Sequence, residues 1–207
     1  MGGCFMSKIM YTEVVRTTNM TEYKQKEREF IELEDKTKSM MSTYIRKVTF
    51  RSDIIDSPID YSIVMEDMED VYVEQKQKDM NVVTKELIPI TKEQANDILN
   101  GNYEFLKHSE DTRLFSFYES IVNHELIPAY RKEFTRKTFH QNKFLDIVFD
   151  VAMSRKPYTT NDFFAPKGFS FKTDYSNLRM SIRQNLTISK PMEQLLAYEK
   201  ELFASNG

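Results

Sequence analysis

The chain has 207 residues, of which 40% are hydrophobic and 29% charged, and its formal net charge is −3. These values are typical of one large folded domain and exclude a disordered chain. No apolar run approaches the about 20 residues of a spanning helix, so no membrane span is expected. The single cysteine, Cys4, excludes an intramolecular disulfide framework and fits a cytoplasmic protein, or a virion component if the source is viral.

Charge is distributed unevenly along the chain. Residues 53–70 contain seven acids and no base, whereas residues 131–143 contain five bases and one acid. Local positive charge decides whether phosphate can bind, so the second segment is either a phosphate contact or an ordinary solvated surface. No basic–aromatic interleaving typical of RNA binding is present, so no nucleic-acid partner is expected.

Residues 21–41 fit two patterns. Tyr23, Phe30 and Leu33 recur at helical spacing, with Thr21 as a candidate N-cap, whereas the last apolar residues alternate with glutamates as in a strand. The length and the Glu/Lys content favour the helix.

Four strands are predicted next in the chain. Residues 43–51 are rich in β-branched and aromatic side chains, and residues 60–65 form a shorter candidate. Residues 70–78 and 82–90 then predict a hairpin around the turn at 78–81.

The strand at 70–78 carries a row of polar side chains. Tyr72, Glu74, Lys76 and Lys78 occupy every second position, so they share one face while the valines between them share the other. Either this face is ordinary solvated surface, or it lines an enclosed space that favours charge.

Two helices follow. Residues 91–101 have the capping-box spacing at Thr91 and Gln94 and a C-terminal glycine stop at Gly101. A second helix is predicted over about 111–126, ended by Pro128.

The last third of the chain returns to strands. Residues 129–139 and 143–152 are predicted strands, 157–190 are predicted to be irregular, and 191–203 form a predicted helix. The expected anchors of the irregular segment are Phe163, Phe164, Phe169 and Phe171.

This order predicts an α+β fold with an antiparallel, tunnel-like β-barrel and flanking helices. The expected division is a helical or extended segment at 1–42, a barrel core at 43–156, and a segment at 157–207 that completes the core or docks on it.

The order of these elements resembles a known family. Residues 70–101 look like the central stretch of VTC-type polyphosphate polymerase domains, with an E-x-K strand, a downstream basic strand and a short helix. ELIPAYRKEF is similar to the Pro…Tyr-x-Arg element of that family, and the residues at 147–150 resemble the end of its Arg-x-Thr-x-Asp strand. These domains are tunnel barrels related to the CYTH triphosphate enzymes.

The resemblance implies roles for individual residues. Glu74 would hold Mn²⁺ or Mg²⁺, and Glu74 and Lys76 would be the catalytic pair. The implied phosphate-binding residues are Lys78, Lys85, Tyr130, Arg131, Lys132 and Arg46. Arg46, Lys47 and Arg51 are the residues that could substitute for the arginines expected in an earlier strand. Glu32, Glu34 and Lys36 match the E-x-E-x-K pattern of CYTH proteins, but a helix there would spread them around a turn.

The chain also departs from the family pattern. The segment before the hairpin has no base, Lys132 stands where an arginine is expected, and Asp146 and Val148 replace the Arg and Thr of the later strand. Each charge-assisted phosphate contact contributes roughly 1.5–3 kcal/mol, so losing several could end turnover while the fold persists.

Two functions therefore remain open. The first is binding of triphosphate, polyphosphate or a nucleoside triphosphate with a divalent metal, with or without phosphoryl transfer. The alternative is a non-catalytic assembly component, such as a bacteriophage virion protein, that uses the same scaffold for protein partners.

Overall fold

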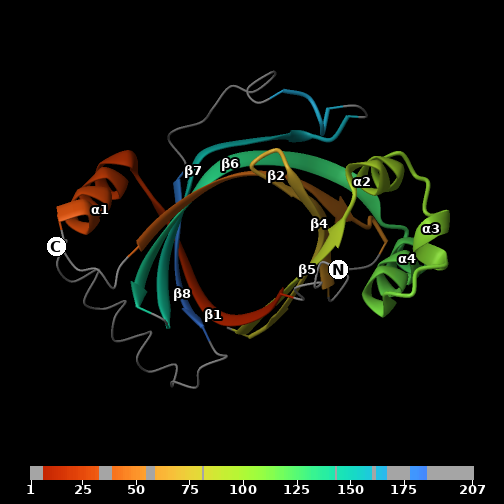
Figure 1. The fold of residues 1–207 in the computed structure, drawn as a ribbon, viewed down its shortest axis with the longest axis horizontal. Coiled ribbons are helices and arrows are strands. Elements are labelled where there is room, and N and C mark those ends of the chain that lie inside the picture. The colour runs from red at the N-terminus through yellow and green to blue at the C-terminus, as the bar shows by residue number, and fades with distance from the viewer. Residues whose placement is uncertain are drawn as a thin grey trace, which may run out of the picture.

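Eight strands pair antiparallel into a closed barrel in this computed structural model (Figure 1). The structure describes residues 7–32, 39–54, 59–80, 82–142, 144–159, 162–166 and 178–185. The strands are β1 (Ser7–Thr18), β2 (Ser39–Arg51), β3 (Ile59–Glu66), β4 (Asp70–Asp79), β5 (Val82–Ile90), β6 (Ile127–Asn142), β7 (Leu145–Pro157) and β8 (Leu178–Asn185). The helices in this part of the chain are α1 (Met20–Glu32), α2 (Lys92–Leu99), α3 (Glu104–Lys107) and α4 (Thr112–His124).

The strand order around the barrel is β1-β5-β4-β3-β2-β6-β7-β8. Pairing of β1 with β8, from Tyr11↔Asn185 to Thr18↔Leu178, closes the sheet on itself. The predicted α+β fold, an antiparallel tunnel-like barrel with flanking helices, is confirmed.

The hairpin of β4 and β5 forms as predicted. Its register runs from Val71↔Ile90 to Asp79↔Val82. Val71 and Val73 are buried in the outer core, whereas Glu74 and Lys76 line a cavity inside the barrel. Of the polar row on β4, Glu74 and Lys76 therefore face an enclosed space, whereas Tyr72 and Lys78 do not line it.

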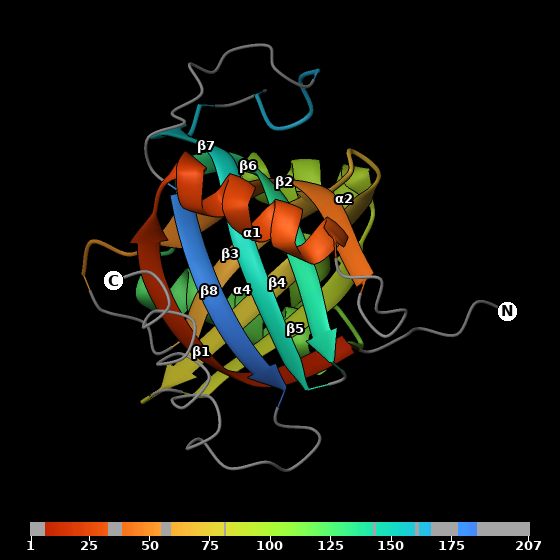
Figure 2. The ribbon, with the colours of Figure 1, turned by 90° about the vertical axis from the view of Figure 1, so that its left-hand side faces the viewer.

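Two hydrophobic cores lie on the outside of the barrel. The larger core packs α2, α3 and α4 against β2 to β5, with the ring of Phe117 stacked on Tyr61 at a centroid distance of 4.7 Å. The second packs α1 against β6 to β8, where Tyr23 meets Phe149 edge to face at 5.4 Å. Figures 1 and 2 show α1 and the α2–α4 group on opposite sides of the barrel. The helices thus cover the outward faces on which they pack, and the inward faces of the strands are left to form the site.

Helix α1 supports the helical interpretation of residues 21–41 as far as Glu32. The side chain of Asn19, rather than that of Thr21, accepts the hydrogen bond from the Glu22 backbone N–H at 2.9 Å. Residues 39–41 belong to β2. The interior position of Thr21 follows from the helix starting one residue earlier, at Met20.

The ends of the later helices are set by local chemistry. Thr91 and Gln94 form the predicted capping box of α2, and Gly101 follows its C-cap with φ +88°, a value that favours glycine. Helix α4 ends at His124, and its C-cap residue, Glu125, adopts the left-handed conformation with φ 50°. Pro128, expected to end this helix, lies inside β6 instead.

The barrel takes strands from all three predicted segments. Strand β1 lies within 1–42 and β8 within 157–190, so the barrel extends beyond 43–156 and the interval 178–185 is not irregular. Phe163 is buried, with 1% of its surface exposed, and packs edge to face with Phe164. Phe169, Phe171 and the predicted helix at 191–203 lie outside the described residues.

None of the helices in the described ranges has the length and hydropathy required to cross a membrane.

Candidate functional site

The barrel encloses a cavity of about 280 Å³. Side chains alternate along each strand, so every second residue of a strand reaches the interior. The side chains that line the cavity are Tyr11, Ile45, Lys47, Thr49, Arg51, Asp60, Ser62, Val64, Glu66, Glu74, Lys76, Lys85, Tyr130, Lys132, Phe134, Arg136, Asp150, Met153, Arg179 and Arg183.

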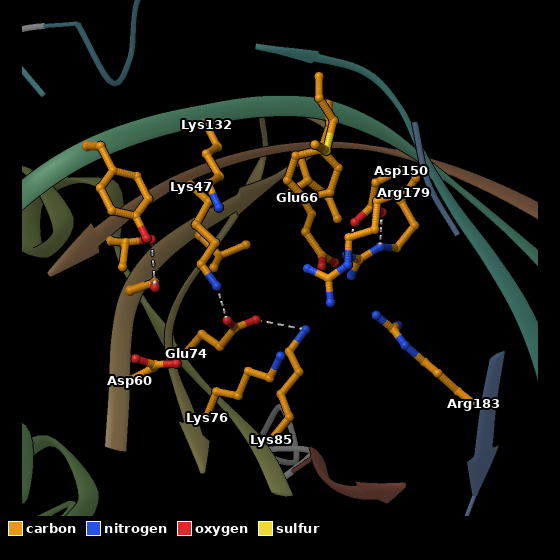
Figure 3. Close-up of a pocket in the computed structure, with 18 of the residues that line it drawn as sticks. Lys47, Asp60, Glu66, Glu74, Lys76, Lys85, Lys132, Asp150, Arg179 and Arg183 are labelled. Carbon is orange, nitrogen blue, oxygen red and sulfur yellow. Dashed lines mark hydrogen bonds and ion pairs between the residues drawn. The ribbon is translucent and has the colours of Figure 1, made fainter. Parts of the chain in front are cut away.

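Basic side chains dominate the charge of this lining. Figure 3 shows lysines and arginines from opposite walls extending toward the middle of the barrel. The eight bases are Lys47, Arg51, Lys76, Lys85, Lys132, Arg136, Arg179 and Arg183, and the four acids are Asp60, Glu66, Glu74 and Asp150. The interior of an acidic protein is therefore a positively charged channel.

Glu74 lies at the centre of a three-strand ionic group. One carboxylate oxygen accepts a hydrogen bond from Lys47 of β2, and the other lies 2.9 Å from the Nζ atom of Lys85 of β5. Burial alone would raise the pKa of Glu74, but the two lysines outweigh it and hold the pKa well below its usual value. Glu74 is therefore an ionised carboxylate held by two ammonium groups.

Two further carboxylates are bound in the same way. The Glu13 carboxylate of β1 forms ion pairs with Arg183 Nε at 2.9 Å and with Arg179 Nη2 at 3.3 Å. Lys76 Nζ lies 3.9 Å from the same carboxylate. Asp150 of β7 accepts a bidentate pair from Arg136, at 2.7 and 2.9 Å. Each carboxylate thus fixes the direction of one or more channel bases.

Lys132 is held differently. Among the described residues no carboxylate lies within ion-pair distance of its ammonium group, which sits 5.1 Å from the centre of the Tyr130 ring. Arg155 lies over the same ring at 4.0 Å. Burial lowers the pKa of Lys132, and the nearby Lys47 and Arg155 lower it further. An incoming anion would relieve this crowding of positive charge.

Comparison with known proteins identifies the family. The VTC domain matches residues 60–200, which is most of the chain. The chain belongs to the VTC domain family. No curated protein sequence matches it.

Solved structures show the same fold as this VTC domain. A putative adenylate cyclase from Bacillus halodurans superposes with a TM-score of 0.60 at 10% identity, covering 97% of this chain and 91% of that one. The Mimivirus capping enzyme triphosphatase gives 0.51 at 11% identity, with 95% and 88% covered. The PH1819 protein of Pyrococcus horikoshii gives 0.50 at 13%, with 94% and 89% covered. At such identities the likeness shows the fold alone.

Five of the residues singled out from the sequence line the channel of the VTC domain: Glu74, Lys76, Lys85, Tyr130 and Lys132. Lys78 continues the row on β4 but is exposed near the end of the strand and does not line the cavity. Glu32 lies at the exposed C-terminal end of α1, and Glu34 and Lys36 lie outside the described residues.

Arg46 and Arg131 point away from the channel. Each follows or precedes an inward residue by one position, so the pleat of the strand turns it outward. Both are 0% exposed, and Glu133 links them through Arg46 Nε, at 2.5 Å, and through Arg131 Nη2. Neither arginine can contact a ligand in the cavity.

The carbonyls of the 162–166 segment complete this outer group. Arg46 Nη1 donates to Phe163 O at 2.5 Å and to Ala165 O at 2.6 Å, and Arg131 Nη1 donates to Asp162 O. The two arginines therefore bind the chain that leaves β7 to the wall of the barrel.

Seven charged residues in or beside the channel had no role among those inferred from the sequence: Glu13, Asp60, Glu66, Arg136, Asp150, Arg179 and Arg183. Lys47 and Arg51, which also line the channel, were named only as possible substitutes for an expected arginine. In β8 the signal was present, because Leu178, Met180 and Ile182 alternate with Arg179 and Arg183. This period-two pattern predicts a strand with one apolar and one charged face.

The described residues do not fit a resident divalent cation. They contain no group of three or more His, Cys, Asp or Glu side chains that could hold one. Both oxygens of Glu74, the implied metal ligand, are already engaged by lysines. Mg²⁺ requires several oxygen ligands in near-octahedral geometry, and two ammonium groups at the carboxylate repel it.

Proposed function

We propose that the channel of this VTC domain binds triphosphate or polyphosphate. The observation that carries the proposal is the enclosed cavity whose described lining contains twice as many bases as acids. Lysine and arginine are the side chains that neutralise phosphate oxygens, and an enclosed site weakens screening by salt.

The state of the channel lysines supports the same ligand class. Burial lowers the pKa values of Lys76 and Lys85 from their usual value, as it does for Lys132. A lowered lysine pKa means that the surroundings do not fully stabilise the charged ammonium group. A phosphate chain beside it would provide the negative charge that stabilises this form. The name of one structural neighbour, a capping enzyme triphosphatase, points to the same chemistry.

Isothermal titration of the protein with tripolyphosphate tests this proposal. We expect binding by the wild type, and an affinity about tenfold weaker in Lys76→Met, since a charge-assisted contact contributes at least about 1.5 kcal/mol. Lys78→Met is the matched control, because it removes the same charge from the same face of β4 outside the cavity.

Two results would count against the proposal. Absence of binding at millimolar tripolyphosphate would remove it. Equal losses in Lys76→Met and Lys78→Met would place the ligand on the outer surface of the protein rather than in the channel. Titration with a nucleoside triphosphate in parallel separates recognition of the phosphates from recognition of a base.

Phosphoryl transfer by Glu74 and Lys76 stays a prediction, and release of inorganic phosphate, with and without Mn²⁺ or Mg²⁺, measures it in the same samples. The assembly role is the second prediction. Size-exclusion chromatography with light scattering tests it by measuring the oligomeric state. A monomer that binds tripolyphosphate and hydrolyses or extends it would contradict a purely structural role.

A further inference from the structure

The carboxylate of Glu74 occupies the position of an anion in the channel. It is 6% exposed, and its oxygens are bound by lysines from two other strands. Figure 3 shows Lys47 and Lys85 approaching it from different walls, with the ammonium groups turned to the middle of the cavity. The lysines thus meet where a phosphate group would lie.

The sheet explains how lysines from separate strands reach one carboxylate. Strand β5 is next to β4, and Lys85 pairs with Lys76, two residues along β4 from Glu74, so the two side chains share a face. Lys47 of β2 must cross β3, where Ser62 stands directly opposite Glu74. Lys47 itself pairs with Val64 of β3, so its side chain reaches Glu74 diagonally across that strand, where the small, buried Ser62 leaves room beside the carboxylate.

Each ammonium group keeps donors for a second acceptor. A lysine has three N–H donors and no acceptor, so one bond to Glu74 leaves two on each lysine. Together Lys47 and Lys85 carry two positive charges beside one carboxylate, the same charge that a divalent cation would bring there. They can therefore bridge Glu74 to a phosphate group as a metal ion would.

We propose that Lys47 and Lys85 replace the divalent cation beside Glu74, so that the channel binds a phosphate chain without metal and Glu74 acts as an internal counter-anion that weakens this binding. The inference rests on the proposed function, since it concerns the same channel. It differs from a metal-ligand role for Glu74 in the direction in which phosphate affinity changes when the charge of Glu74 is removed. A metal ligand strengthens phosphate binding, whereas a counter-anion competes with it.

The test is titration of tripolyphosphate into wild type, Glu74→Gln and Glu104→Gln, each in EDTA and in Mn²⁺. Glutamine keeps the size of the side chain and removes its charge. Glu104→Gln makes the same change at a side chain that is 77% exposed on α3, outside the channel. Thermal melting of each variant verifies that it is folded.

We expect the wild type to bind in EDTA, and Glu74→Gln to bind about tenfold more tightly because the two lysines lose their competing carboxylate. Glu104→Gln should match the wild type. Titration of Mn²⁺ alone into the wild type should give no stoichiometric binding.

The inference is overturned if the wild type binds tripolyphosphate only when Mn²⁺ is present, or if Glu74→Gln loses binding while it melts like the wild type. In either case the proposed function stands, in the first with a metal and in the second with Glu74 as a group that supports binding. Absence of binding in both buffers instead removes the proposed function. If Glu74→Gln does not fold, titration of the wild type in EDTA and titration with Mn²⁺ alone still decide whether phosphate binding needs a metal.

Discussion

At the scale of single residues, the channel is organised by acid–base pairs whose partners come from different strands. Asp150 and Arg136 are the clearest pair, with two short hydrogen bonds and side chains that are 7% and 19% exposed. Removing one partner of a buried pair leaves an uncompensated charge, and this costs more than the intact pair contributes.

Asp150→Asn should therefore destabilise the protein. We expect the free energy of unfolding at pH 7 to fall by about 2–3 kcal/mol, measured by urea denaturation. Asp146→Asn, four residues earlier on β7, is the control, because its side chain is 35% exposed and its pair with His140 is worth at most about 1 kcal/mol. Equal effects of the two changes would contradict this difference in burial.

The same aspartate predicts a dependence of stability on acid. Burial alone would raise the pKa of Asp150, but Arg136 outweighs it, so the folded pKa lies below the usual 3.8. The contribution of ionised Asp150 to stability is therefore complete above about pH 4. It is lost as the pH falls through the pKa that Asp150 has in the folded protein. Urea denaturation between about pH 5 and pH 2 should show a shallower loss of stability in Asp150→Asn than in the wild type, and parallel curves would contradict the assignment.

At the scale of elements, β4, β6 and β8 show what the sequence could predict. In β4, alternation put Glu74 and Lys76 on one face, and the family resemblance favoured an inward direction for that face, which is where both are found. In β6, three consecutive residues were assigned to phosphate, but a pleated strand can turn only Tyr130 and Lys132 inward. Strand β8 was overlooked because its eight residues stand in a segment without other strand signals.

Other features lay beyond the sequence because they depend on distant pairing. No local pattern indicates that Glu13 of β1 meets Arg183 of β8, since closure of the barrel brings them together. The capping box of α2 could be predicted because all of its atoms lie within four residues. Residue types thus predicted most strands and helices, and the barrel determined which charges meet.

The outer arginine group gives a prediction for the segment 162–166. Arg131→Met should lower the free energy of unfolding by about 3–5 kcal/mol, because it leaves Glu133 with one fewer cation and frees Asp162 O from its donor. Affinity of the folded protein for tripolyphosphate should stay unchanged, since Arg131 does not line the cavity. A tenfold weaker affinity at unchanged stability would show that Arg131 does act on the ligand.

At the scale of the whole molecule, a chain with net charge −3 encloses a basic interior. The rest of the sequence is acidic enough to offset it, so net charge gave no sign of an anion site. Lys76 on β4, Lys85 on β5 and Lys132 on β6 face one space, and the pKa of each is lowered, first by burial. Ligand binding should therefore change the protonation of the barrel as a unit.

We expect tripolyphosphate to raise these lysine pKa values, because an anion favours the charged ammonium form. Binding at about pH 9 should then take up protons, and affinity should fall as the pH rises through the lowered pKa values. Titration calorimetry in buffers of different ionisation enthalpy measures the uptake. Lys85→Met should reduce it and Lys78→Met should not; heats independent of the buffer would contradict the coupling.

The unbroken ring of strand pairs has a consequence for access. Each described strand is hydrogen-bonded to a neighbour on both sides, so a solute cannot enter the cavity between two strands. Entry must follow the barrel axis, from a mouth. An open-ended phosphate can lead with its terminus, whereas a cyclic one such as trimetaphosphate has no terminus to lead with. If the channel binds phosphate as proposed, we therefore expect it to admit a linear chain more readily than a ring of the same charge per phosphorus.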